Sequence, residues 1–96
     1  MATPFQARWI SRERATRLKR AGSLGHAILL DTFNGFLVIE PVGSDIGDGP
    51  VLSLEEANYE LQGVWYTGPR SRLREARTRL GLEPEALAER KPAYAV

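Results

Sequence analysis

The residues with the clearest capacity for binding chemistry are arginines, and ten of the eleven lie in two segments of the chain, residues 8–20 and 70–79. Eleven of the thirteen basic residues are Arg, and none of the thirteen lies between Ala21 and Pro69. Residues 1–20 carry a formal charge of +5, residues 21–69 carry −7, residues 70–79 carry +4 and residues 80–96 carry −1, so the net charge of +1 conceals a strong separation of charge. Arg favours two-point contacts with phosphate or carboxylate and stays charged when partly buried.

The two arginine clusters allow two interpretations. If the segments lie side by side, they form a basic surface for nucleic acid or for an acidic partner. If they face the acidic segment between them, they neutralise the chain's own carboxylates, among them Glu55, Glu56 and Glu60. The candidate contact residues are Arg12, Arg17, Arg20, Arg70, Arg72, Arg74 and Arg77.

No residue pattern in the sequence indicates catalysis or a bound metal. His26 is the single histidine, and no nucleophile elbow accompanies it. The chain has no Cys, which excludes disulfides and thiolate metal sites. Asp45 and Glu56 stand at the first and twelfth positions of an EF-hand loop, but Gly47 and Gly49 supply no side-chain oxygens at the third and fifth. We therefore predict a protein without enzymatic activity, cofactor or metal.

The elements that must position these residues begin with a predicted helix. Ser11 is a suitable N-cap, and Gly22 is a suitable stop after Ala21. Ala15 and Leu18 give this helix only a narrow apolar stripe, which predicts that it covers an edge of the core.

A β-hairpin follows, formed by the runs HAILLDTF and FLVIEPV around Asn34-Gly35, a dipeptide that favours a type I′ turn. A two-residue loop there pairs Phe33 with Phe36. One face is then almost wholly apolar and is the predicted core: Ile28, Leu30, Thr32, Leu37 and Ile39. The other face is mixed and needs a cover, supplied by the chain itself or by a partner.

The mixed face supplies the second group of candidate residues. Its aromatic side chains, together with two that follow later in the chain and two carboxylates at its rim, have the composition of a protein-binding surface. These residues are Phe33, Phe36, Trp65, Tyr66, Asp31 and Glu40. A homodimer that buries this face is a further alternative.

The second half of the chain predicts helices. Residues 43–50 are a loop by composition, after which Ser53 and Glu56 form a capping box for a helix that ends at Gly63. Residues 64–67 are β-prone and predict a third strand. Ser71 is the expected cap of a second basic helix, with its arginines outward. A short helix is expected over residues 84–90.

Residues 71–90 resemble the first helix, turn and second helix of Xre/Cro-type helix-turn-helix repressors. The matching residues are Leu73, Arg74, Glu75, Arg77, Leu80, Gly81, Leu82, Glu85, Leu87, Ala88, Glu89 and Arg90. In that family a recognition helix follows and enters the major groove of DNA. Here only six residues follow Arg90, so the resemblance carries over no base-reading residue, and a plain helical hairpin is the expectation.

We thus predict one α+β domain over residues 1–96: an antiparallel hairpin or small three-stranded sheet packed with three to four short helices. Residues 1–10 form an apolar lead-in segment, for which a short strand and a docking segment are the two alternatives, and residues 91–96 form a tail. No apolar run approaches the ~20 residues that a membrane helix requires, and the lack of Cys suits a cytoplasmic protein.

The expected function is binding. We predict a small non-catalytic regulatory protein that acts on a protein or nucleoprotein partner, such as a phage- or plasmid-type inhibitor or accessory protein. The alternative is a protein that binds DNA or RNA directly through its two Arg-rich helices.

Overall fold

The computed structural model describes residues 4–63 and 66–84. The elements are β1 (Phe5–Ile10), α1 (Arg12–Ala21), β2 (Ile28–Thr32), β3 (Gly35–Pro41), α2 (Leu54–Glu60) and α3 (Arg70–Arg79). A three-stranded antiparallel sheet with helices packed on it confirms the α+β class.

The third strand of the sheet comes from the start of the chain. The strand order is β1-β3-β2, and β1 pairs with β3 from Phe5 opposite Pro41 to Ile10 opposite Phe36. The prediction of a third strand over residues 64–67 was wrong for Tyr66 and Thr67, which lie in no strand, while residues 64–65 lie outside the described residues. The apolar side chains of the lead-in segment therefore belong to the sheet.

The hairpin forms where it was predicted, but its turn lies one residue earlier. Thr32 pairs with Gly35 and Asp31 with Phe36, so the turn residues are Phe33 and Asn34, and the predicted Phe33–Phe36 pair is absent. The Thr32 hydroxyl closes this turn by donating to the Gly35 carbonyl at 2.7 Å. Gly35 has φ 145°, and a Cβ atom there would lie 3.3 Å from the Trp9 ring. Both registers keep the same residues on the same faces, so the predicted core face was right.

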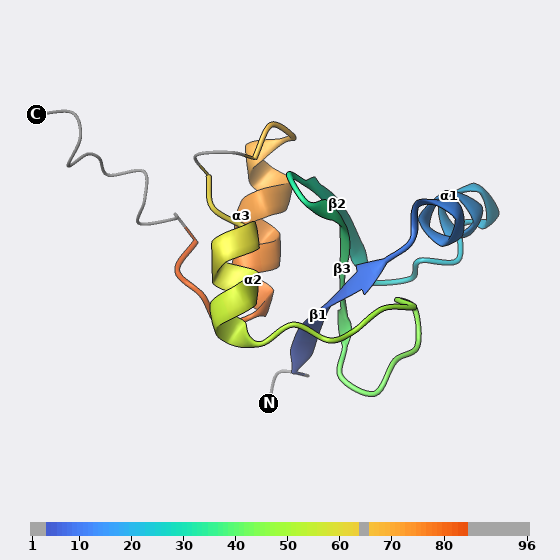
Figure 1. Ribbon diagram of the computed structural model, residues 1–96, viewed down its shortest axis with the longest axis horizontal. Coiled ribbons are helices and arrows are strands. Elements are labelled where there is room, and N and C mark those ends of the chain that lie inside the picture. The colour runs from blue at the N-terminus through green and yellow to red at the C-terminus, as the bar shows by residue number, and fades with distance from the viewer. Residues whose placement is uncertain (1–3, 64–65, 85–96) are drawn as a thin grey trace, which may run out of the picture.

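The sheet lies between two layers of helix (Figure 1). On one face α2 and α3 pack side by side against the predicted core residues, and Leu61, Leu73 and Ala76 are central to this cluster. On the other face Ala15 of α1 is buried with Leu29 and Val38. The mixed face is therefore covered by the chain's own first helix.

The helix ends follow their capping residues. Ser11 caps α1 by accepting from the Arg14 amide, and Gly22 ends it in the left-handed conformation. The capping box of Ser53 and Glu56 is present, although α2 ends at Glu60 with Leu61 as its C-cap, before the predicted stop at Gly63. Pro69, not Ser71, precedes the first turn of α3. The predicted helix over 84–90 and the tail over 91–96 lie outside the described residues, apart from Pro84.

Within the described residues, no helix combines the length and the apolar composition that crossing a membrane requires.

Candidate functional site at the edge of strand β2

The two arginine-rich helices lie on opposite faces of the sheet, so they do not run side by side as one basic groove (Figure 1). The arginines of α3 and those of α1 therefore lie in different surroundings.

The arginines of α3 are largely occupied within the fold. Arg77 was expected on the surface, but only 2% of it is exposed. Its guanidinium donates to the Leu61 carbonyl at 2.9 Å, to Asn58 Oδ1 at 2.8 Å and to the Glu83 carbonyl at 2.6 Å. Burial of a guanidinium requires such a complete set of acceptors, so Arg77 is a structural residue.

Three further α3 arginines donate to backbone carbonyls, and the contact of Arg72 with the Leu29 carbonyl is the longest of these. Arg70 Nη1 contacts the Gly63 carbonyl at 3.1 Å. Arg79 donates to the His26 carbonyl and to the Glu75 carboxylate, and it lies over the Phe5 ring. Arg74 and Arg72 are exposed.

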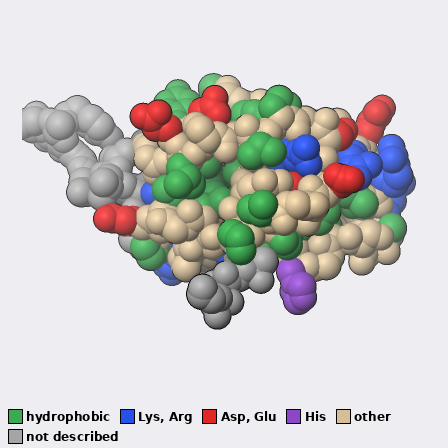
Figure 2. Space-filling model, turned by 90° about the horizontal axis from the view of Figure 1, so that it is seen from below, with side chains coloured by type: hydrophobic (Ala, Val, Ile, Leu, Met, Phe, Trp, Pro, Cys, Tyr) green, Lys and Arg blue, Asp and Glu red, His purple; other side chains and the backbone are tan. Residues whose placement is uncertain are grey.

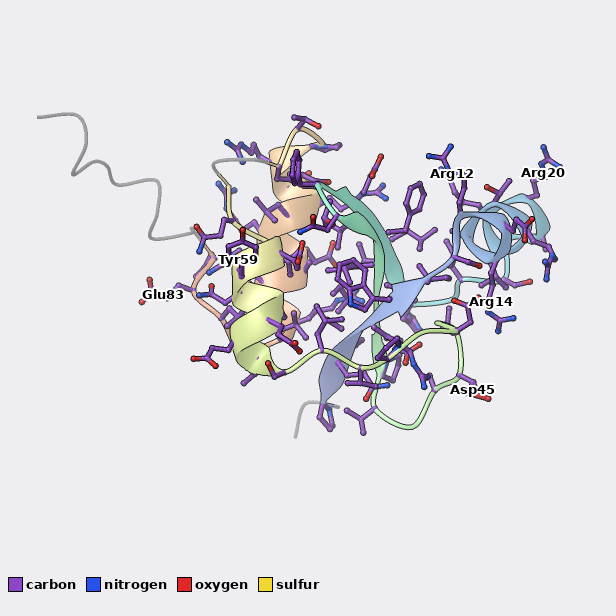
Figure 3. The ribbon with its side chains drawn as sticks, in the orientation of Figure 1. Arg12, Arg14, Arg20, Asp45, Tyr59 and Glu83 are labelled. Carbon is purple, nitrogen blue, oxygen red and sulfur yellow. The ribbon has the colours of Figure 1, made fainter. Side chains whose placement is uncertain are left out.

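The arginines of α1 are mostly directed toward solvent. Figure 3 shows Arg12 and Arg20 extending away from the body of the molecule, whereas Arg14 reaches toward the loop that holds Asp45. Arg14 donates to the Ile46 carbonyl at 2.6 Å and to the Asp45 carbonyl at 3.0 Å. Arg17 and Arg20 are exposed, with no hydrogen bond or ion pair to another described residue. Figure 2 shows the resulting basic end of the molecule.

Glu40 was expected at the rim of a binding surface, but its side chain is fully buried. Its carboxylate accepts from Gln6 Nε2 at 2.6 Å and from the Ile46 and Gly47 amides at 3.1 and 3.0 Å. Arg8 Nη1 lies 3.5 Å from it. Glu40 thus holds the loop after β3 against β1 and is not available to a partner.

A cleft of about 390 Å³ opens beside β2, and it collects side chains from both faces of the sheet. We call it the β2-edge cleft. It is lined by Lys19, Leu29, Leu30, Asp31, Phe36, Tyr66, Thr67, Gly68, Pro69 and Arg72. Four of the predicted contact residues, Asp31, Phe36, Tyr66 and Arg72, therefore meet at one place. The two basic helices also meet there, each through a single cation.

Two aromatic rings give the cleft its apolar part. Phe36 lies opposite Asp31 across the hairpin, and the Arg12 guanidinium lies 5.6 Å from the centre of its ring. Tyr66 is buried, and burial raises the pKa of its hydroxyl while the charge of Arg72 opposes that rise. Gly68 approaches the same ring so closely that a Cβ atom there would lie 2.6 Å from Tyr66 Cζ. The loop of residues 66–69 is therefore shaped around this ring.

The backbone of β2 contributes to the site as well, because β2 is an edge strand. The opposite edge of the sheet is closed: Trp9 N donates to the Pro50 carbonyl at 3.1 Å, and Leu52 N donates to the Ala7 carbonyl at 2.9 Å. Within the described residues, no such backbone bond covers the outer side of Leu29 or Asp31.

A second hollow of about 380 Å³ continues along the same edge. It is lined by Leu24, Gly25, Ala27, Ile28, Leu29, Ser71, Arg72 and Glu75. Leu29 and Arg72 border both hollows, and Arg72 Nη1 donates to the Leu29 carbonyl at 3.4 Å. One arginine thus separates two hollows that follow the strand edge.

The remaining candidate residues lie apart from the cleft. Phe33 is 83% exposed at the hairpin turn, and Trp65 lies outside the described residues. His26 is exposed before β2, and Glu56 is occupied in the capping box of α2. In the described part of the chain, no group of three or more His, Cys, Asp or Glu side chains is placed to hold a metal ion.

Sequence reasoning missed Lys19, Leu29 and Leu30 as lining residues. Leu30 was assigned to the core face of the hairpin, and neither Lys19 nor Leu29 was named as a candidate contact residue. The signal that could have found them is the edge position of β2, and this depends on recognising residues 5–10 as the strand on the other side of β3.

Comparison with known proteins yields no relative: no protein-family model matches the sequence, no curated protein aligns with it significantly, and no solved structure matches its fold significantly.

Proposed function

We propose that this chain is a small, non-catalytic regulatory protein that binds a protein partner at the β2-edge cleft. The single observation that carries the proposal is the convergence of Phe36 and Tyr66 with a rim of Lys19, Asp31 and Arg72 around one cleft. Aromatic residues and Arg are enriched where proteins meet. In this proposal the protein acts in the cytoplasm as an inhibitor or accessory protein.

The exposed Phe33 extends the proposed contact surface. It follows Asp31 by two residues, at the end of the same strand edge. A large apolar side chain with this exposure gains free energy when a partner covers it, on the order of 2 kcal/mol for full burial. Phe33 is therefore the expected anchor next to the cleft.

Affinity capture of the tagged protein from its own host, with nuclease treatment, tests the proposal through matched charge variants. Lys19→Glu and Asp31→Arg change the cleft rim, and we expect each to reduce recovery of the partner by about tenfold or more. Arg20→Glu and Asp45→Arg are the controls, because they make the same charge changes at exposed residues outside the cleft. A nuclease-resistant partner that all four variants recover equally well would contradict the proposed site.

A second candidate function is nucleic-acid binding by α1 alone. The observation that favours it is the group of exposed cations Arg17, Lys19 and Arg20, whose side chains make no hydrogen bond or ion pair to other described residues. Phosphate contacts make affinity fall steeply with salt, with a slope of about 0.9 per neutralised phosphate in duplex DNA.

A salt titration with random-sequence duplex DNA and single-stranded RNA tests this second candidate. The double variant Arg17→Glu/Arg20→Glu should weaken binding and flatten the salt dependence, while Asp31→Arg should not weaken it. If the unaltered protein binds neither nucleic acid at low salt, this candidate is wrong.

A further inference from the structure

We propose that the β2 edge takes up an extended acidic segment of the partner as a fourth strand of the sheet, with Arg72 as the ligand for one of its carboxylates. This inference rests on the proposed function and specifies the partner's chemistry. Edge strands with unpaired backbone groups are templates for strand addition.

The alternation of hydrogen bonds across the sheet identifies the groups that are available. Backbone atoms of Ala7 and Trp9 face residues 49–52, away from β3. In an antiparallel ladder alternate residues face opposite sides, so Phe36 and Val38 face β1 while Leu37 and Ile39 face β2. Their β2 partners are Leu30 and Ile28. The backbone groups of Leu29 and Asp31 therefore face outward, where an added strand would lie.

The two hollows supply room for such a strand on both faces of the sheet. Side chains of an added strand point alternately to the two faces. On the α1 face they would meet Leu29 and Phe36, which suit apolar residues, and Asp31, which repels acidic ones. On the α3 face they would meet Tyr66 and Arg72. Lys19 also lines the cleft from α1, but Asp31 on that face offsets its charge. Acidic residues are therefore expected mainly on the face that holds Arg72.

Arg72 can release its present partner, the Leu29 carbonyl, for a carboxylate of the added strand because its present hydrogen bond is weak. A guanidinium has five donors, and the one hydrogen bond of the Arg72 side chain to a described residue is the long 3.4 Å contact with the Leu29 carbonyl. The nearby Glu75 is engaged by Arg79 at 2.8 Å. An entering strand would take over the Leu29 carbonyl through its own amide, and the released guanidinium would gain a shorter, charge-assisted bond to carboxylate.

The direct test uses capped eight-residue peptides added to the ¹⁵N-labelled full chain. The probe alternates valine and glutamate. Two derivatives carry N-methyl groups on all valines or on all glutamates, because strand pairing uses the amides of only one alternate set. We expect the parent peptide and one derivative to shift the Leu29 and Asp31 amide signals and to slow their hydrogen exchange. The other derivative should bind about tenfold more weakly or worse.

Charge exchange tests the role of Arg72. Arg72→Glu should weaken binding of the valine–glutamate peptide by about tenfold or more. The same variant should bind a valine–lysine peptide more tightly than the unaltered protein does. Arg17→Glu is the matched control, because it makes the same charge change on α1, outside both hollows. Equal effects of the two variants would reduce Arg72 to a contribution to overall charge and would contradict its assigned role.

The outcomes separate this inference from the proposed function. If both N-methylated peptides bind as well as the parent, or if no peptide shifts Leu29 and Asp31, strand addition is wrong. The proposed function still stands if capture of a partner depends on Lys19 and Asp31. If the free protein sediments as a dimer with these two amides already protected from exchange, the occupant is a second copy of the chain and the acidic peptide is wrong.

Discussion

The helices α1 and α3 have the same length and charge, but their arginines make different contacts. Each has ten residues, and each contains five basic residues and one acidic residue, for a formal charge of +4. Within α3, Arg77 is buried and Arg70 and Arg79 donate to backbone carbonyls. Among the basic side chains of α1, only that of Arg14 has a hydrogen bond to another described residue, whereas Arg17 and Arg20 are exposed.

The difference lies in what each helix has beside it. α3 packs next to the C-terminal end of α2, where the last carbonyls of a helix lack intrahelical partners. The Leu61 carbonyl at the C-cap of α2 is such a group, and Arg77 donates to it. Arg70 donates to the Gly63 carbonyl in the segment that follows the helix. α1 lies over a face of the sheet, and in the described part of the chain its arginine side chains reach only the carbonyls of Asp45 and Ile46, in the loop after β3. Available acceptors, not charge, decide which arginines are taken into the fold.

The largest effect on stability is expected from the removal of Arg77, which tests whether α3 is the more integrated helix. Arg77→Ala deletes the donor of three hydrogen bonds of 2.6 to 2.9 Å and leaves the Leu61 carbonyl and Asn58 without that donor. We expect the free energy of unfolding to fall by about 3 kcal/mol, measured by urea denaturation. Arg77→Lys keeps the charge and should recover only part of the loss. A change below about 1 kcal/mol for Arg77→Ala would show that α3 is no more integrated than α1.

The second prediction concerns the exception within α1. Arg14→Ala removes the two bonds that tie the helix to the loop at residues 45 and 46. Because these bonds are partly exposed, we expect a smaller loss, about 1.5 kcal/mol, in the same urea assay. Arg20→Ala is the matched control on the same helix. Equal effects of the two substitutions would mean that Arg14 does not anchor α1.

The third prediction uses pH to probe the start of α1. The Asp48 carboxylate accepts from the hydroxyl and the amide of Ser11, both at 2.8 Å, and these bonds lower the pKa of Asp48 below its ordinary value of 3.8. A group whose pKa is lower in the folded state stabilises the fold above its unfolded pKa and loses this effect as the pH falls through the folded pKa.

The unaltered protein should therefore be more stable than Asp48→Asn at neutral pH, and the difference should shrink as the pH falls below 3.8. Parallel urea denaturation from neutral to acidic pH measures this. A difference that does not change with pH would contradict the role of the carboxylate charge.

The smallest expected effect comes from the exposed α1 arginines. Arg17→Ala and Arg20→Ala should each change the free energy of unfolding by no more than about 0.5 kcal/mol, because substitutions at exposed positions without specific contacts have little effect. Thermal unfolding of the two variants checks this. A loss near that of Arg77→Ala would show that the outward arginines also hold the fold together.

The sequence was sufficient where local chemistry decides the structure. Ser11 and the Ser53–Glu56 pair identified two helix starts, because a capping side chain bonds within its own first turn. The apolar alternation of the hairpin identified its core face. The turn was placed one residue late because the Thr32 hydroxyl bonds the Gly35 carbonyl, a contact that the preference of Asn-Gly for type I′ turns does not include.

The candidate site was only partly accessible from the sequence, since it depends on long-range pairing. The sequence identified four of the lining residues as candidate contacts, but no local interaction brings them to one cleft. These residues are Asp31, Phe36, Tyr66 and Arg72. Glu40 and Arg77 were expected at the surface because charged residues usually are. Both are buried, because distant acceptors and donors complete their hydrogen bonds.

The central position of β3 has a consequence for the order in which the chain folds. Its pairing with β2 is local and closes through a two-residue turn, whereas its pairing with β1 joins residues as far apart as Phe5 and Pro41. Local contacts cost less chain entropy and form sooner. The β2–β3 hairpin is therefore expected to form early and to act as the template to which β1 adds, so that substitutions in the turn slow folding while substitutions in β1 mainly speed unfolding. On this pathway the first strand of the chain is the last to join its own sheet.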